Sequence, residues 1–171
     1  HSPRLDSPVA FRHFERSQRR IPAPLLLSMA RVAFHRRDLQ RARQFVEDIL
    51  SEQRRHVGAM EMLLRIDLAE SRKTDAEQHV RTLLSIDPDH ALANFVLGTL
   101  YYERRQYALA EAALRASAEA QPSPEALNSL AYVLVKTGQP SEALPLAERA
   151  LSLDETDGAI WDTYGLALLR T

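Results

Sequence analysis

The side chains best suited to chemistry in this chain are its six histidines, because its 171 residues include no cysteine. A metal site on a helix needs two ligands three or four residues apart, and no two histidines have that spacing. His56 and His90 lie 34 residues apart, which favours surface or turn positions that recur with a repeat. The zinc-protease HExxH pattern, the G-x-S-x-G turn, glycine-rich phosphate loops and the dinucleotide fingerprint are absent. The sequence therefore predicts no catalytic residue, no metal site and no cofactor.

One small residue recurs along the chain at a nearly constant interval. Its positions are Ala42, Ala76, Ala110 and Ala143, at intervals of 34, 34 and 33 residues. This period is typical of stacked helical hairpins, which bury their apolar faces only against their neighbours. Apolar residues also recur at helical spacing, as in Leu25, Met29 and Val32, whereas no alternating strand pattern occurs. We therefore expect an all-α protein in which the small residues let two helices approach closely.

The repeat resembles the tetratricopeptide repeat, whose pattern runs W-x2-L-G-x2-Y, then A-x3-F, then P. The best copy matches at Leu97, Gly98, Tyr101, Ala110, Leu114 and Pro122, and the last copy at Trp161, Tyr164 and Gly165. The resemblance implies a right-handed α-solenoid of stacked antiparallel helix pairs. The domains it implies are a degenerate helix or linker over 1–22, repeats at 23–56, 57–90, 91–123 and 124–157, and the first helix of a fifth repeat over 158–171.

Local signals indicate where the second helix of several repeats begins. Asp38 can cap the first of them, Thr74 to Glu77 has the form of a capping box, and Pro140 suits a first turn. Pro145 is expected to strain or kink the second helix of the fourth repeat. Only that repeat has glycine, Gly138, at the turn between its helices. The other repeats have Arg37, Ser71 and Arg105 at this position.

Charge is nearly balanced overall, at −1, but it is uneven along the chain. Residues 1–56 carry twelve arginines against six acids, whereas residues 124–157 carry two bases against six acids. The basic N-terminal stretch is interpreted as a solvated helix face, with an acidic partner or an anionic surface as the alternative. No nucleic-acid-binding motif occurs, so no nucleic-acid partner is predicted.

Composition bounds the source and the compartment only loosely. Twenty arginines against two lysines suggest a GC-rich bacterial genome. No apolar run approaches the about 18 residues that a membrane helix needs, and no signal peptide is present. The absence of cysteine leaves the cell envelope, the periplasm and the cytoplasm all open.

The resemblance also implies a binding groove lined by the first helix of each repeat. The predicted groove residues are Arg31, Phe34, Arg65, Phe95, Thr99, Tyr102, Tyr132 and Lys136, and the same face includes Leu27, His35, Glu61, Leu68, Glu103, Ser129, Asp162 and Leu166. Some family members clamp a terminal carboxylate with paired Lys and Asn residues, and this pair is absent. Aromatic and arginine side chains dominate binding hot spots, which favours a binding surface. The alternative is that Phe95 and Tyr102 only pack between hairpins.

The function implied by the resemblance is a non-catalytic scaffold that binds a protein or peptide segment in this groove. Two alternatives stay open. The stretches from Glu125 to Ala131 and from Leu146 to Leu151 resemble tandem-repeat proteins of bacterial envelope and exopolysaccharide-export assembly. A regulatory module attached to a larger enzyme is the other.

The two ends of the chain carry separate predictions. Val9, Phe11 and Phe14 predict a helix over roughly 8–20, packed on the first repeat. At the other end the sequence stops at Thr171 in mid-repeat, so we expect a helix from Gly158 or Ala159 packed on the second helix of the fourth repeat. The side chains expected to pack there are Ile160, Trp161, Tyr164 and Leu168. An open apolar strip on this helix predicts self-association through it.

Overall fold

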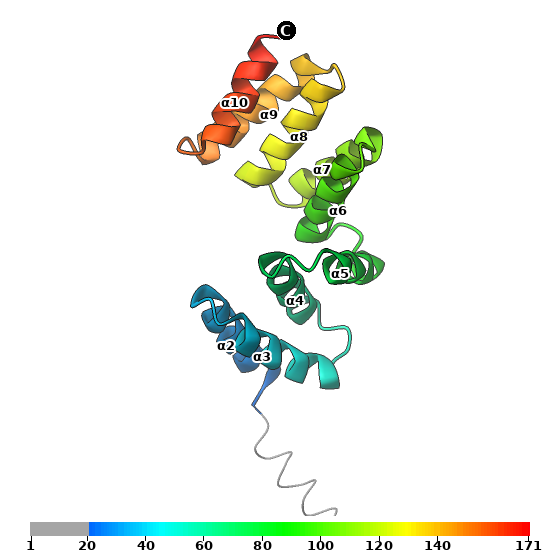
Figure 1. Cartoon of the computed structure of the whole chain (residues 1–171), viewed down its shortest axis with the longest axis vertical. Helices are drawn as coiled ribbons and strands as arrows, with labels where there is room; N and C mark the ends of the chain where they lie inside the picture. The colour runs from blue at the N-terminus through cyan, green and yellow to red at the C-terminus, as the bar shows by residue number, and fades with distance from the viewer. Residues whose placement is uncertain (1–20) are drawn as a thin grey trace, which may run out of the picture. The chain divides into compact units, whose positions relative to one another are not determined.

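Figure 1 shows the computed structural model of the chain, which describes residues 21–171. Within this range all the regular elements are α-helices, which confirms the all-α class. They are α2 (Ala23–His35), α3 (Leu39–Glu52), α4 (Val57–Ala69), α5 (Lys73–Ile86), α6 (Ala91–Glu103), α7 (Tyr107–Ala120), α8 (Pro124–Lys136), α9 (Pro140–Leu153) and α10 (Gly158–Leu168). The helix predicted over 8–20 lies outside the described residues.

The chain forms two compact units, one ending at Met62 and the other beginning at Leu63. In the first unit, α2 packs on α3. The side chains that these two helices bury are Leu26, Ala30, Ala33, Ala42, Val46 and Ile49. The unit also contains the start of α4.

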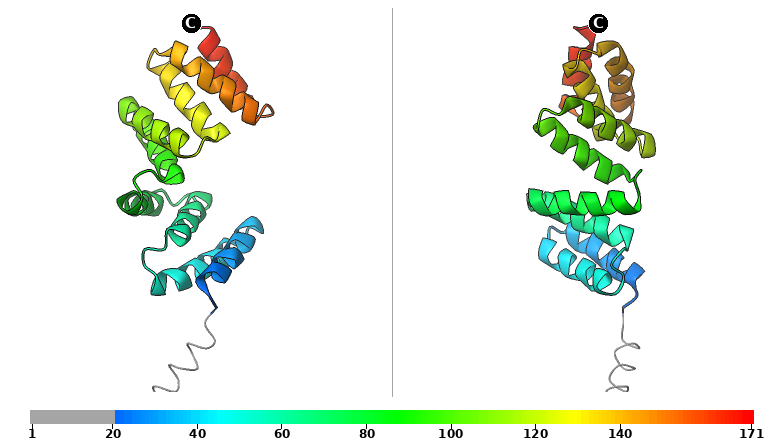
Figure 2. Two further views of the ribbon diagram at one scale, coloured as in Figure 1. Left: turned by 180° about the vertical axis from the view of Figure 1, so that it is seen from behind. Right: turned by 90° about the vertical axis from the view of Figure 1, so that its right-hand side faces the viewer.

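In the second unit the helices from α6 onward form antiparallel pairs, α6 with α7 and α8 with α9, and α10 packs on both α8 and α9 (Figure 2). Its core lies mainly between α7, α8, α9 and α10, where apolar side chains of all four helices are buried. At the other end of this unit, His79 of α5 and Asp67 of α4 are joined by a 2.6 Å contact between Nδ1 and a carboxylate oxygen. Asp67 is fully buried, so this contact gives its carboxylate a partner and links α4 to α5.

Small residues stand where the helices of a pair come closest. The recurring alanines, Ala42, Ala76, Ala110 and Ala143, are at most 2 % exposed. At Gly98 of α6 the approach is closer still, because a Cβ atom placed there would lie 2.6 Å from Cγ of Leu114 in α7. Both observations agree with the expectation that small side chains permit close helix packing.

Each helix pair is closed by one residue in the left-handed backbone conformation. These residues are Arg37 (φ 63°), Ser71 (φ 58°), Arg105 (φ 58°) and Gly138 (φ 82°). In each turn the next backbone N–H donates to the carbonyl five residues earlier, as from Asp38 to Ala33 at 3.0 Å and from Gln139 to Leu134 at 2.8 Å. This is the Schellman arrangement of a helix C-terminus. The second helix then starts two residues after the left-handed one in all four pairs.

This turn geometry decides which predicted helix starts are right. Asp38 caps α3 by accepting from the backbone N–H of Arg41 at 3.1 Å, and Pro140 is the first residue of α9, as predicted. The capping box from Thr74 to Glu77 is wrong. Because the left-handed residue is Ser71, the helix already begins at Lys73 and no side chain caps it. The helix α9 continues through the exposed Pro145, which has no N–H to donate to the carbonyl of Ser141. Strain or a kink at this residue stays a prediction.

The two recurring histidines cap the next helix. The Nδ1 atoms of His56 and His90 accept from the backbone N–H groups of Ala59 and Ala93, at 3.1 and 3.3 Å. Their turn position is thereby confirmed, but His90 is buried and the surface interpretation is wrong for it. Among residues 21–171 no three His, Asp or Glu side chains are grouped so as to hold a metal ion. No helix in the same range has the length and apolar character needed to span a membrane.

The last helix, α10, begins at Gly158 and packs on α9, as predicted. Ile160 is fully buried in this contact. Trp161 and Leu168, however, stay 52 % and 48 % exposed, and the Trp161 indole N–H donates to the carbonyl of Glu155 at 2.9 Å. An apolar edge is therefore present on α10, and self-association through it stays a prediction.

Candidate functional site

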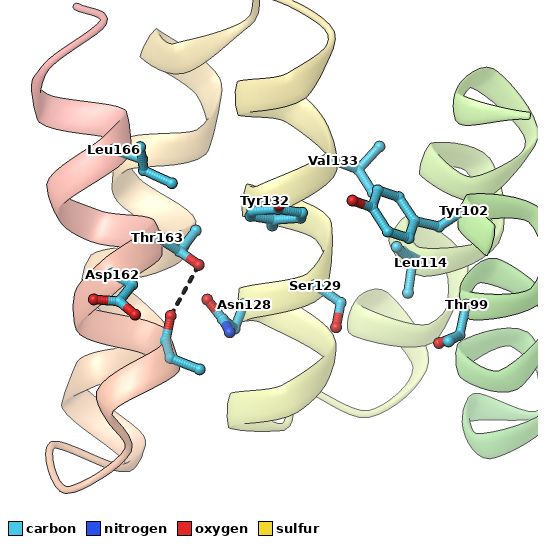
Figure 3. A pocket seen from close by; sticks show the side chains of 11 residues that line it. Thr99, Tyr102, Leu114, Asn128, Ser129, Tyr132, Val133, Asp162, Thr163 and Leu166 are labelled. Carbon is cyan, nitrogen blue, oxygen red and sulfur yellow. Dashed lines mark hydrogen bonds between the residues drawn. The ribbon is translucent and has the colours of Figure 1, made fainter. Parts of the chain in front are cut away.

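A cavity of about 340 Å³ opens between α6, α8 and α10 in the second unit (Figure 3). Its lining consists of Thr99 and Tyr102 from α6, Leu114 from α7, Asn128, Ser129, Tyr132 and Val133 from α8, and Ala159, Asp162, Thr163 and Leu166 from α10. The lining residues of α6, α8 and α10, the first helices of their repeats, recur at intervals of three or four positions, so those of each helix lie on one helix face. Helical periodicity alone thus brings them to a common wall.

Tyrosines form one end of the cavity. The ring centroids of Tyr102 and Tyr132 lie 5.7 Å apart in an edge-to-face arrangement, and Tyr107 lies 5.8 Å from Tyr102. Hydrogen bonding between the two hydroxyls, with burial and neighbouring phenols adding to it, raises the pKa of Tyr102 to about 12. The same interaction, assisted by Lys136, lowers the pKa of Tyr132. The Lys136 ammonium lies 5.1 Å from the centre of the Tyr132 ring, so this wall is held by side-chain contacts on both sides.

Polar side chains form the other end. Figure 3 shows Thr99, Ser129, Asn128 and Asp162 in a row along that end, from α6 across α8 to α10, with the Tyr132 ring and Leu166 on the other side of the row. The hydroxyl of Thr99 donates to the carbonyl of Phe95, and that of Thr163 to the carbonyl of Ala159, both at 3.0 Å. The Oδ1 atom of Asn128 is buried and has no hydrogen-bond partner within residues 21–171. The cavity is therefore lined by aromatic side chains and by polar ones.

The structure brings part of the predicted groove together. Thr99, Tyr102 and Tyr132 line the cavity, and Lys136 supports the Tyr132 ring. Tyr102 also packs against the core, so the packing alternative holds beside the lining role. Arg65 and Phe95 line a separate depression of about 320 Å³ at the start of α6.

Two predicted groove residues belong to the first unit and are described there by themselves. Arg31 is exposed on α2, and the ring of Phe34 contacts that of His35 edge to face at 6.2 Å. Neither residue is among those lining the cavity of the second unit.

The prediction missed several lining residues. The most consequential is Asn128, which the repeat count passed over in favour of its neighbour Ser129. The third repeat is one residue shorter than its predecessors, so the position of Phe95 recurs 33 residues later at Asn128, just as that of Thr99 recurs at Tyr132. The interval between Ala110 and Ala143 carried this signal. Leu114, Val133, Ala159 and Thr163 were missed because they lie at the floor and edges of the groove face.

Comparison with known families decides what kind of repeat this is. A family model described as tetratricopeptide repeat matches residues 61–124 and 95–160, which together cover more than half of the chain. The chain belongs to the tetratricopeptide-repeat (TPR) family. No curated protein sequence matches it significantly.

Solved TPR structures share the fold. A thermophilic TPR protein of Thermus thermophilus is 21 % identical with a TM-score of 0.65, and the match covers 94 % of this chain and 89 % of that one. PilF of Pseudomonas aeruginosa is 17 % identical with a TM-score of 0.69, covering 86 % and 68 %. YrrB, described as a TPR protein with an unusual peptide-binding site, is 17 % identical with a TM-score of 0.69, covering 92 % and 81 %. The two organisms named are bacteria, in keeping with the predicted bacterial source.

Proposed function

We propose that this TPR protein is a non-catalytic scaffold that binds a segment of a partner protein in the cavity between α6, α8 and α10. The observation that carries the proposal is one cavity lined both by two partly buried tyrosines in edge-to-face contact and by polar side chains, among them Asn128 with its unpartnered Oδ1. Tyrosines bury a large area at small entropic cost, and a few convergent polar groups fix the orientation of a ligand. TPR proteins as a family bind proteins and peptides.

The chemistry of the lining supports binding over catalysis. Its ionisable groups are one carboxylate, Asp162, and the two phenols of Tyr102 and Tyr132. The phenols interact with each other, and no lining hydroxyl has a base in hydrogen-bond contact to activate it, as covalent catalysis would require.

The test fills the cavity without disturbing the fold. Thr99 and Ser129 are changed together to Met, because Met is a good helix former whose unbranched side chain would occupy the groove. The matched control changes Ala112 and Ser141, exposed residues of α7 and α9 that do not line the cavity, to Met. Peptides are first selected on the unmodified protein from a random dodecapeptide display library, and their affinities are then measured by fluorescence anisotropy.

The double variant T99M/S129M should bind the selected peptides at least about tenfold more weakly, a loss of about 1.4 kcal/mol. The control A112M/S141M should bind them as the unmodified protein does. Equal affinity of the cavity-filled variant, or selection of no peptide at all, would contradict a peptide-binding function for this cavity.

A further inference from the structure

The cavity has a chemical preference at its polar end. We infer that the bound segment carries an arginine or lysine side chain that docks at Asn128 and Asp162, next to an apolar side chain packed on the tyrosines. This inference rests on the function proposed above and specifies the class of its ligand.

The first support is the balance of donors and acceptors. Thr99 is exposed and already donates its hydroxyl proton to the backbone carbonyl of Phe95, so its oxygen is left as an acceptor. Oδ1 of Asn128 is buried without a donor. A buried acceptor without a partner costs stability in the free protein. Because Asn128 lines the cavity, a turn of its side-chain amide would bring Oδ1 to the cavity surface, where a ligand N–H would satisfy it. Guanidinium and ammonium groups carry several such donors and no acceptor.

The second support is the charge of the wall. Asp162 is the one charged residue among those lining the cavity, and its exposed carboxylate makes no hydrogen bond or ion pair within residues 21–171. The cations near the opposite end are engaged by the protein itself. Lys136 lies over the Tyr132 ring, and Arg170 donates to the carbonyl of Val135 at 3.1 Å. An acidic ligand side chain at the polar end would therefore meet a carboxylate with no compensating cation.

The third support is the net charge of the second unit. Residues 63–171 contain ten Lys and Arg residues against sixteen Asp and Glu residues, a net charge of −6. A surface of this sign attracts cationic segments during encounter and disfavours acidic ones. The long-range charge and the local acceptors thus select the same kind of ligand.

Reversing the charge of one lining residue tests the inference. Random dodecapeptides displayed on phage are selected against the unmodified protein, against Asp162→Lys, and against Glu148→Lys. Glu148 is an exposed residue of α9 outside the cavity, so E148K repeats the change in net charge without touching the site.

Peptides from the unmodified protein and from E148K should be enriched in Arg or Lys at a fixed spacing from a large apolar residue. Peptides from D162K should lose that enrichment or show Asp and Glu instead, and an arginine peptide should bind D162K at least tenfold more weakly. Selected peptides without a basic preference, or an unchanged preference in D162K, would overturn the inference while leaving peptide binding intact. Selection of no peptide would remove the proposed function and this inference with it.

A second variant separates binding from a structural role. Asn128→Leu removes the unpartnered amide and keeps its size, so the free protein should gain about 2–4 °C in Tm. The affinity for the arginine peptide should fall at least fivefold at the same time. A lower Tm for N128L would show that Asn128 serves the fold, and an unchanged affinity would show that it does not contact the ligand.

Discussion

At the residue scale, the turns inside the helix pairs show a conflict between side chain and backbone. The left-handed conformation costs a residue with a Cβ atom about 1–2 kcal/mol, yet Arg37, Ser71 and Arg105 adopt it. They are held there because the Schellman hydrogen bonds on either side satisfy the end of the preceding helix. Gly138 is the one residue of the four that adopts this conformation without steric cost.

Replacing each of these three residues by Gly should therefore stabilise the protein. The gain should be about 0.5–1 kcal/mol per site, since relief of the left-handed strain exceeds the extra entropy that Gly brings to the unfolded chain. The matched control, Gly138→Ala, should lose about 1 kcal/mol at the equivalent position. Urea unfolding followed by circular dichroism measures all four values. Destabilisation by Arg105→Gly and Ser71→Gly would contradict the assigned backbone conformation.

Individual residues also show where sequence rules held and where they failed. Asp38 was predicted as a cap because it combines a capping side chain with the position that the turn provides. Thr74 has a capping side chain but stands two residues after the N-cap position, Arg72, because the left-handed residue Ser71 fixes the start of α5. A capping pattern covers only the residues at the helix start, so it cannot predict where the preceding turn places that start. Asn128 was missed for a related reason, a one-residue change in the repeat length.

At the element scale, helix contact follows from the placement of small residues. Gly98 allows α6 to approach α7 closely. A Cβ atom added to Gly98 would lie only 2.6 Å from Cγ of Leu114 in α7. A Cβ atom added to Gly165 in α10 would have no neighbouring atom within 4 Å. The family pattern predicts both glycines from sequence, but only packing shows that one of them is required and the other is not.

Changing each of these glycines to Ala should have opposite effects. Gly165→Ala should raise the free energy of unfolding by up to about 1 kcal/mol, because Ala is the better helix former and meets no neighbour. Gly98→Ala brings the same gain but forces Leu114 away, and overpacking of this kind costs about 1–3 kcal/mol, so the net effect should be destabilising. Thermal unfolding of both variants gives the comparison. An equal gain in both would show that α6 and α7 are not in close contact.

At the scale of the whole molecule, periodicity predicted the fold class and the helix pairs. It did so because each repeat buries its core only against its neighbours, so local spacing determines the contacts. The shape and chemistry of the cavity were less predictable. They depend on which first helices come together around Tyr102 and Tyr132, and on polar groups such as Asn128, whose burial is set by packing rather than by spacing. The envelope-assembly and enzyme-regulation alternatives stay predictions.

The central claim is that a partner segment occupies the face formed by α6, α8 and α10. Backbone amide chemical shifts of the ¹⁵N-labelled full chain, recorded while the selected arginine peptide is added, test it most directly. The largest changes should fall on Thr99, Ser129, Tyr132, Asp162 and Thr163. Changes concentrated instead on the exposed faces of α7 and α9, around Ala112 and Ser141, would contradict the account.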